Sequence, residues 1–268
     1  MTEISILVAG AGGRMGRAVI TEVLAARGAT LAGGFERPGS DAVGADLGHL
    51  VGLDRLGLAV ADAPDEGLKH ASVLIDFTTP SASLDHARAC AAAGRAHVIG
   101  ATGFSPAEEK EIAALAEKIA IVKSGNMSLG VNLLSALVEQ AAAKLSDAYD
   151  IEILDIHHRM KIDTPSGTAL MLGKAAAKGR CVDLDRHSVY ERYGQTGARK
   201  KGDIGFAVLR GGGVIGEHEV RFAGDQEVLT LSHSALDRRL FAKGAVAAAK
   251  WTIGQPSGLY SMRDVLGL

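Results

Sequence analysis

A glycine-rich turn between a short apolar run and a helical pattern is the feature that most restricts how this chain can fold. The run Ile4–Ala9 has the length of a buried strand, and residues 17–24 have helical spacing. Between them, Gly10, Gly12 and Gly16 have the spacing G-x-G-x-x-G. In this context the first glycine permits a tight turn, the second admits a pyrophosphate close to the backbone, and the third lets helix and strand pack closely. The pattern predicts the start of a dinucleotide-binding fold, and a purely structural loop is the less favoured alternative.

An acidic residue follows where such a fold needs one. A second strand-like run, residues 30–35, ends in Glu36, about twenty residues after the last glycine, where a carboxylate accepts hydrogen bonds from ribose hydroxyls. Arg37 adds a cation for a 2′-phosphate. The pair predicts that both NADH and NADPH bind.

Strand-like runs and helical patterns continue to alternate through the first half. Further strands are expected at residues 73–77, 97–99 and 119–122. The segments that follow them are residues 76–80, 100–103 and 124–127. Alternation of this kind predicts a Rossmann-type, doubly wound parallel sheet, with ligands beyond the carboxyl ends of the strands. The three segments are therefore expected to share one site.

The second half has a different pattern. A long apolar helix is expected at residues 129–145, and a strand at 149–157 places Ile151, Ile153 and Asp155 on one face. Later strands are expected at 204–209, 214–222 and 227–233, and helices at 237–253 and 261–266. Residues 179–202 have little pattern and are expected to form a loop. This half predicts an α+β substrate domain with a mostly antiparallel or mixed sheet.

The segment from His157 to Thr168 concentrates reactive side chains. It contains two imidazoles and a lysine, and Ser166, Gly167 and Thr168 follow a proline, where they can open a helix whose backbone N–H groups bind an anion. Such a segment suits a small acidic substrate that takes up a proton. Taken alone, a basic surface loop leading into a helix is an equally good interpretation.

Composition excludes several classes of protein. The chain has 268 residues and a net charge of −2, which gives no reason to expect nucleic acid or membrane-surface binding. Apolar runs fall short of the ~20 residues of a membrane span, so a cytoplasmic protein is expected. Cys90 and Cys181 are expected to be reduced and structural. No metal site is expected, because the histidines at 49, 70, 86 and 97 lack metal-binding spacing, and those at 218 and 233 are expected to pack on strands.

At this point the chain resembles the 4-hydroxy-tetrahydrodipicolinate reductase (dihydrodipicolinate reductase) family. The resemblance depends on three segments: residues 10–17, Asp76-Phe77-Thr78, and the pattern H-H-x-x-K-x-D-x-P-S-G-T-A that begins at His157. Shorter similarities lie at residues 102–104, 130–132, 216–218 and 257–266. The resemblance covers nearly the whole chain, and its histidine–lysine pattern is highly specific.

The resemblance implies an enzyme of lysine and diaminopimelate biosynthesis. Such an enzyme uses NADH or NADPH to reduce a cyclic imine dicarboxylate, 4-hydroxy-tetrahydrodipicolinate, to tetrahydrodipicolinate, and the family is usually homotetrameric. A dinucleotide-binding domain of residues 1–127 plus 238–268 is implied, with residues 128–237 forming a substrate-binding and oligomerisation domain.

The resemblance also assigns roles to residues. His157 and Lys161 correspond to proton donors. The cofactor-binding residues are Gly10, Ala11, Gly12, Gly13, Arg14, Met15, Glu36, Arg37, Gly100, Ala101, Thr102, Ser124, Gly125, Asn126 and Met127. The substrate-binding residues are His158, Lys161, Ser166, Gly167 and Thr168. The chain departs from the family pattern at Ala101, Met127, Asp155, Ile156 and Thr164, which affects cofactor preference and pocket shape rather than the reaction.

Two rival functions stand beside this one. A dehydrogenase of aldehydes would need a reactive thiol near the nicotinamide, and neither Cys90, inside a helical pattern, nor Cys181, beside a loose loop, suits that role. A dinucleotide-sensing regulator or assembly factor would share the fold. The presence of both His157 and Lys161 disfavours a sensor, which needs no proton donor.

Overall fold

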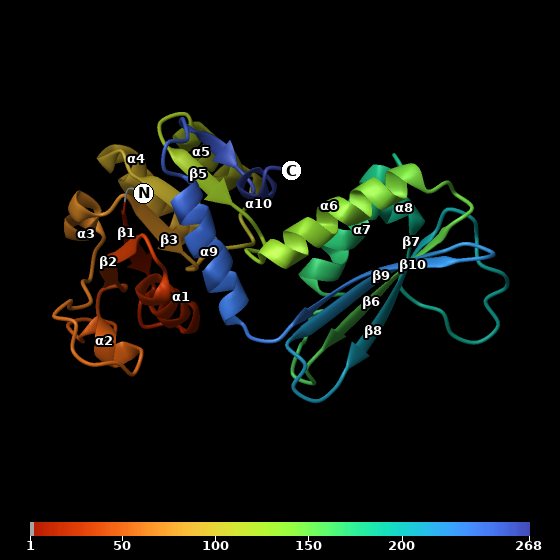
Figure 1. Ribbon diagram of the computed structural model, residues 1–268, viewed down its shortest axis with the longest axis horizontal. Coiled ribbons are helices and arrows are strands. Elements are labelled where there is room, and N and C mark those ends of the chain that lie inside the picture. The colour runs from red at the N-terminus through yellow and green to blue at the C-terminus, as the bar shows by residue number, and fades with distance from the viewer. Residues whose placement is uncertain (1–2) are drawn as a thin grey trace. The chain divides into compact units, whose positions relative to one another are not determined.

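The computed structural model describes residues 3–268, whose contacts form two compact units (Figure 1). Unit 1 contains the described residues up to Ser128 together with Arg239–Gly267. Unit 2 contains Leu129–Arg238. Unit 1 is therefore built from two stretches of chain that are separated in sequence by the whole of unit 2.

Unit 1 is organised around a six-stranded sheet with the order β11-β5-β4-β3-β1-β2. Every neighbouring pair is parallel. The strands are β1 Ile4–Ala9, β2 Ala29–Phe35, β3 Val73–Asp76, β4 Ala96–Ile99, β5 Ala120–Lys123 and β11 Gly258–Tyr260. The sequence prediction of a doubly wound parallel sheet is confirmed.

Helices cover both faces of this sheet. Helices α1 (Arg14–Ala25) and α9 (Arg239–Trp251) contact each other, and α9 also contacts β3 and β4. Helices α3 (Asp65–His70), α4 (Pro80–Ala93) and α5 (Pro106–Ala116) pack on the other face. Side chains alternate along a strand, so Leu7 and Ala9 join the cluster containing residues of α3, α4 and α5, while their neighbours point toward α1 and α9.

Local sequence explains where these helices begin. Ser105 accepts a hydrogen bond from the Glu108 amide, the Glu108 side chain bonds back to Ser105, and Pro106 occupies the first turn of α5. Short α2 (Leu47–Leu50) and α10 (Met262–Leu266) complete the unit.

Unit 2 contains a five-stranded sheet with the order β10-β9-β6-β8-β7. Its strands are β6 Asp150–His157, β7 Ser188–Val189, β8 Ile204–Arg210, β9 Gly216–Ala223 and β10 Val228–Ala235. The pairs β6–β9 and β9–β10 are antiparallel, whereas β6–β8 and β7–β8 are parallel. The sheet is therefore mixed, because the long connection before β8 returns the chain in the same direction as β6.

Two helices cover one face of the second sheet. Helices α6 (Leu129–Lys144) and α7 (Gly167–Gly179) contact each other and enclose a core containing Ile151, Ile153, Val220 and Phe222 (Figure 1). Short α8 (Leu184–His187) and β7 lie within the stretch expected to be a loop. Among residues 3–268, no helix is long and apolar enough to cross a membrane.

Burial along β6 alternates strictly, with Ile151, Ile153, Asp155 and His157 buried. A carboxylate and an imidazole thus continue the row of apolar side chains that faces α6 and α7.

Candidate functional site

In unit 1, a cleft of about 670 Å³ lies where β1, β2 and β3 end. Among the expected cofactor-binding residues, its lining includes Gly10, Gly13, Arg14, Met15, Glu36 and Arg37. From the β3 side, Phe77, Thr78 and His86 also line it. The cleft therefore has the position at which a doubly wound sheet binds ligands.

Glycine is required in the turn between β1 and α1. Gly10 has a φ of +64°, and a Cβ on Gly16 would lie 2.0 Å from the carbonyl oxygen of Gly10. A Cβ on Gly12 would lie 2.7 Å from that of Ala42. Helix α1 can begin against the turn only because these side chains are absent.

The region of this turn offers both hydrogen-bond donors and a hydrogen-bond acceptor. Gly13, the N-cap residue of α1, has no side chain to cap the first turn, which leaves that helix start suited to an anion. The amide of Gly12 donates to Glu36 Oε1 over 3.0 Å, so the Glu36 carboxylate lies beside the turn at the end of β2. A helix start for pyrophosphate next to an acceptor for ribose hydroxyls fits a dinucleotide.

The remaining expected cofactor residues lie on loops after β4 and β5. Gly100 follows β4 and packs against Phe77, where a Cβ would lie 2.3 Å from the ring. Gly125 lies beside Thr102, with 3.8 Å between the position of a Cβ on Gly125 and Thr102 Cγ2. Both loops follow the carboxyl ends of neighbouring parallel strands, but their residues are not part of the cleft lining.

Two of these loop residues have buried side chains. Ala101 is 5% exposed and Met127 is 1% exposed. Their side chains belong to the core of unit 1, so neither offers a side chain to a ligand. Next to Met127, Asn126 shapes the loop, because its Oδ1 accepts from the Ser128 amide over 2.8 Å and its carbonyl accepts from the Ser124 hydroxyl over 2.8 Å.

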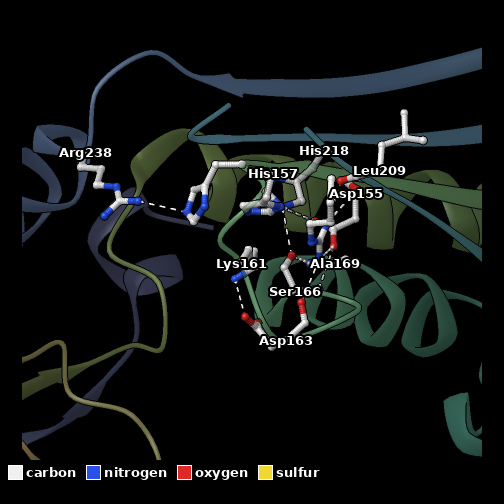
Figure 2. Close-up of polar contacts among 11 residues, drawn as sticks. Asp155, His157, Lys161, Asp163, Ser166, Ala169, Leu209, His218 and Arg238 are labelled. Carbon is white, nitrogen blue, oxygen red and sulfur yellow. Dashed lines mark hydrogen bonds and ion pairs between the residues drawn. The ribbon is translucent and has the colours of Figure 1, made fainter. Parts of the chain in front are cut away.

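In unit 2, the buried carboxylate of Asp155 is the centre of a polar network (Figure 2). Its Oδ2 accepts from the Ser166 amide over 2.8 Å and from Arg210 Nη2 over 3.0 Å. Its Oδ1 lies 2.9 Å from His157 Nδ1 and 3.3 Å from His218 Nε2. One carboxylate therefore joins three strands of the sheet to the start of α7.

The charges in this network set the protonation of its members. Burial would raise the pKa of Asp155, but hydrogen bonds from His218, Ser166 and Arg210 outweigh it and hold that pKa well below its usual range. Burial lowers the pKa of His157 to about 4, against the opposing attraction of Asp155 and with added repulsion from His218 and Lys161. At neutral pH, Asp155 is ionised and His157 is neutral.

Two expected substrate-binding residues, Lys161 and His158, lie on the loop after β6. Lys161 Nζ forms an ion pair with Asp163 Oδ1 over 2.8 Å, and its side chain is 20% exposed. His158 Nε2 lies 3.2 Å from Arg238 Nη2. Both groups are partnered in the absence of an anion and are still within reach of solvent.

Helix α7 begins at Gly167, as the sequence predicts for a segment following Pro165. Ser166 is its N-cap: its hydroxyl accepts from the Ala169 amide over 3.1 Å and lies 3.2 Å from His218 Nε2. This hydrogen bond holds the helix start in place, and because Ser166 is only 2% exposed, its hydroxyl is turned inward. A Cβ on Gly167 would meet nothing within 4 Å, so the first turn of α7 adjoins open space.

Sequence reasoning did not identify Asp155, Arg210 and His218 as parts of the site. His218 was expected to be a packed strand histidine, and Asp155 was placed on one strand face with Ile151 and Ile153 and noted as a departure from the family pattern, without a role in the site. The available signal was an acid at an inward-facing position of β6, two residues before His157.

Within residues 3–268, the one group of side chains that could hold a metal is Asp155, His157 and His218, with donor atoms within 4.8 Å of one another. A cation there would compete with Arg210 for the Asp155 carboxylate. The arrangement is better described as an ion pair between Asp155 and Arg210 with two imidazoles packed beside it.

Models of two protein domains match almost the whole chain. They are described as dihydrodipicolinate reductase, N-terminus, which matches residues 4–127, and dihydrodipicolinate reductase, C-terminus, which matches residues 130–266.

Full-length relatives are similar to this chain at high identity. The 4-hydroxy-tetrahydrodipicolinate reductase of Rhizobium rhizogenes (strain K84 / ATCC BAA-868) is 55% identical and covers 99% of this chain and 97% of its own. The 4-hydroxy-tetrahydrodipicolinate reductase of Sinorhizobium medicae (strain WSM419) is 53% identical, and the match covers 100% of this chain and 98% of the relative.

Solved structures share the fold. Dipicolinate-bound dihydrodipicolinate reductase from Paenisporosarcina sp. TG-14 has a TM-score of 0.77 at 23% identity, covering 97% of this chain and 98% of its own. GenD2 from gentamicin A biosynthesis, in complex with NAD, has a TM-score of 0.59 at 15% identity, covering 94% and 86%. At these identities the likeness concerns the fold alone.

Proposed function

The chain belongs to the dihydrodipicolinate reductase family, and from this premise we propose how its residues carry out the reaction. It is a dinucleotide-dependent oxidoreductase that reduces 4-hydroxy-tetrahydrodipicolinate, a cyclic imine dicarboxylate, to tetrahydrodipicolinate in lysine biosynthesis. Unit 1 holds the cofactor and unit 2 holds the substrate.

The cofactor is NADH or NADPH. The pyrophosphate binds at the start of α1 beside Gly10–Met15, and Glu36 accepts hydrogen bonds from the adenosine ribose. Arg37 supplies a cation next to that ribose. The loops at 100–102 and 124–127 border the nicotinamide. When bound, the reduced nicotinamide supplies the hydride for the reaction.

The substrate's two carboxylates bind to groups of unit 2. The first turn of α7, at Gly167 and Thr168, binds one of them through backbone N–H groups. Lys161 binds the other as a hydrogen-bonded cation, and the neighbouring His158 ring adds a hydrogen bond. Ser166 contributes by fixing the start of the helix from its buried position.

Proton delivery falls to Lys161 and His157. The 4-hydroxyl group of the substrate leaves as water, hydride addition places electron density on the ring, and the ring then takes up a proton. Lys161 carries a proton as an ammonium group. His157 is neutral in the free protein, and the approach of a dicarboxylate raises its pKa, because nearby negative charge favours the protonated ring.

A single observation supports this proposal most strongly. The Asp155 carboxylate bonds to the Ser166 amide at the start of α7 and lies 2.9 Å from His157 Nδ1. Anion binding and proton handling therefore depend on one buried group. A sensor of dinucleotides would need neither.

We also propose a homotetramer located in the cytoplasm. The helices of unit 2 lie on one face of its sheet, and the uncovered face includes Leu209 and Val228, which are 52% and 48% exposed. Apolar groups on an uncovered sheet face suit a second copy of the chain. A cytoplasmic enzyme has access to reduced nicotinamide cofactor. Sedimentation velocity would test the assembly, and a monomer at micromolar concentration would contradict it.

An assay of cofactor oxidation tests the function. The substrate is generated enzymatically in the same reaction, and NADH and NADPH are supplied in turn. We expect substrate-dependent oxidation with both. Binding of cofactor without any turnover would contradict the reductase and support the sensing regulator instead.

A further inference from the structure

A second buried carboxylate, in unit 1, has no part in the reaction proposed above. Asp76, at the end of β3, is 0% exposed. Its Oδ1 accepts from the Thr78 amide over 2.7 Å and from the Thr78 hydroxyl over 2.6 Å, and its Oδ2 lies 2.8 Å from His86 Nδ1. His97 Nε2 lies 3.4 Å from the same Oδ2. Burying a carboxylate is costly unless it is partnered, so this cluster fixes what it contacts.

The group that it fixes on the cleft side is His86. This residue of α4 lines the cofactor cleft together with Phe35, Pro38 and Pro64, and its side chain is 15% exposed. Its ring meets that of Phe35 edge to face, with 4.9 Å between centroids and an interplanar angle of 89°. One hydrogen bond and one ring contact therefore hold the imidazole in a single orientation.

The partner also decides which ring nitrogen carries the proton. An ionised carboxylate can only accept a hydrogen bond, so Nδ1 of His86 must be the donor to Asp76. In the neutral imidazole, Nε2 is then left with its lone pair and acts as an acceptor. When the ring is neutral, the cleft thus contains an acceptor whose identity is fixed by the Asp76 carboxylate behind it.

We propose that His86 selects the purine base of the cofactor, with Nε2 accepting a hydrogen bond from the exocyclic amine of adenine. This inference depends on the proposed function, because it requires that the cleft bind a dinucleotide. Asp76 is the positioning residue that maintains the tautomer. The Glu36 carboxylate lies beside the glycine turn, in the place of the ribose acceptor, so His86 is left for another part of the nucleoside.

The chemistry of the cleft favours a base at this position. Phe35, Pro38 and Pro64 provide apolar surface for a flat ring, and His86 adds one acceptor. Adenine presents an amino donor at C6, whereas hypoxanthine presents a carbonyl oxygen there, which a lone pair repels. The site should therefore discriminate between 6-amino and 6-oxo purines.

Binding of two reduced cofactors tests the proposal. Calorimetry would compare NADH with reduced nicotinamide hypoxanthine dinucleotide on the full chain. We expect the wild-type chain to bind NADH about tenfold more tightly, the equivalent of about one hydrogen bond. In His86→Asn, the amide can still donate to Asp76 but offers nothing at the Nε2 position, so the two affinities should fall within about twofold of each other.

Two further variants sharpen the test. His49→Asn makes the same substitution at an exposed histidine of α2 and should keep the wild-type preference. In Asp76→Asn, the amide can donate to Nδ1, which moves the proton to Nε2 and should reduce or reverse the preference. Because loss of the buried charge can impair folding, the comparison between His86→Asn and His49→Asn remains decisive by itself.

The outcomes separate this inference from the function that it depends on. If the wild-type chain binds NADH but shows no preference, or if His86→Asn keeps it, base selection by His86 is wrong and the reductase stands. If the wild-type chain binds neither dinucleotide, the proposed function fails and the inference fails with it.

Discussion

Asp155 Oδ1 lies 2.9 Å from Nδ1 of His157, two residues further along the same buried face of β6. The carboxylate is fully buried and is also held by Arg210 and by the start of α7. Yet burial keeps His157 neutral at physiological pH. The imidazole therefore lies beside an anion without being charged by it.

The stability of the protein should decrease as pH falls toward 4. His157 has a pKa of about 4 in the folded chain and an ordinary value of 6.5 when unfolded. Between these values the unfolded chain binds a proton that the folded chain does not, so protonation favours unfolding. At 1.36 kcal/mol per pKa unit, the loss between about pH 7.5 and about pH 4.5 is roughly 2.5 kcal/mol. Urea unfolding of the wild type and of His157→Gln at both pH values isolates the contribution of His157 to this loss of stability. An equal loss of unfolding free energy in both proteins would contradict the lowered pKa of His157.

Removing either proton-handling side chain should impair catalysis in a distinct way. His157→Ala should mainly lower kcat, by about 10²–10⁴-fold, which is typical of a positioned acid. Lys161→Ala should lower kcat and raise KM together, because it removes a carboxylate partner as well as a proton donor. Steady-state kinetics measures both effects. Lys174→Ala, an exposed lysine of α7, is the matched control. Near-normal turnover in both variants would favour the sensing regulator.

A side chain at the start of α7 should interfere with the substrate alone. A Cβ on Gly167 meets no atom within 4 Å, so Gly167→Ala and Gly167→Val should fold normally. Both side chains enter the space where a carboxylate would approach the first turn. KM should therefore rise modestly for alanine and by about tenfold or more for valine, roughly 1.4 kcal/mol. Calorimetry with NADH should show unchanged affinity, and a variant that lost cofactor affinity instead would disprove the separation into two half-sites.

Preference between the two cofactors should be modest and should depend on Arg37. In the proposed mode of binding, Glu36 accepts from ribose hydroxyls, while the neighbouring Arg37 can pair with a 2′-phosphate. We expect the affinities for NADH and NADPH to differ by no more than about a hundredfold, roughly 2.7 kcal/mol. Arg37→Ala should weaken NADPH binding and leave NADH binding nearly unchanged. Calorimetry with both cofactors decides, and a thousandfold preference in the wild type would contradict the expectation.

Local patterns predicted the larger elements of the fold. Strands such as β1 and β3 are apolar runs that end at glycine or proline turns, and the alternation along β6 correctly assigned its two faces. The smaller elements β7, α8 and β11 have no such pattern. β11, only three residues long, exists because Leu259 pairs with Ile121 of β5, which is distant in sequence. Tertiary contacts create such a strand, and local propensity does not reveal it.

The candidate site divides in the same way. His157 and Lys161 lie in one short segment, so their association could be predicted from the sequence. The network around Asp155 depends on strand register: Asp155 pairs with His218 across β6 and β9, and His157 pairs with Arg210 across β6 and β8. A shift of one residue would turn these side chains to the opposite face. The register between distant strands cannot be read from a single sequence, and so the network around Asp155 was not predicted.

The assembly of unit 1 from two separated stretches has a consequence for biosynthesis. A ribosome makes all of Leu129–Arg238 before α9 and β11 exist. Until then, α1, β3 and β4 lack their contacts with α9. Strand β5 pairs with β4 alone and forms an open edge of the sheet. A nascent or prematurely terminated chain therefore has an incomplete nucleotide-binding fold with apolar surface open to chaperones and proteases. The last stretch of the chain to be made therefore completes the sheet at whose strand ends the cleft of residues 9–86 lies.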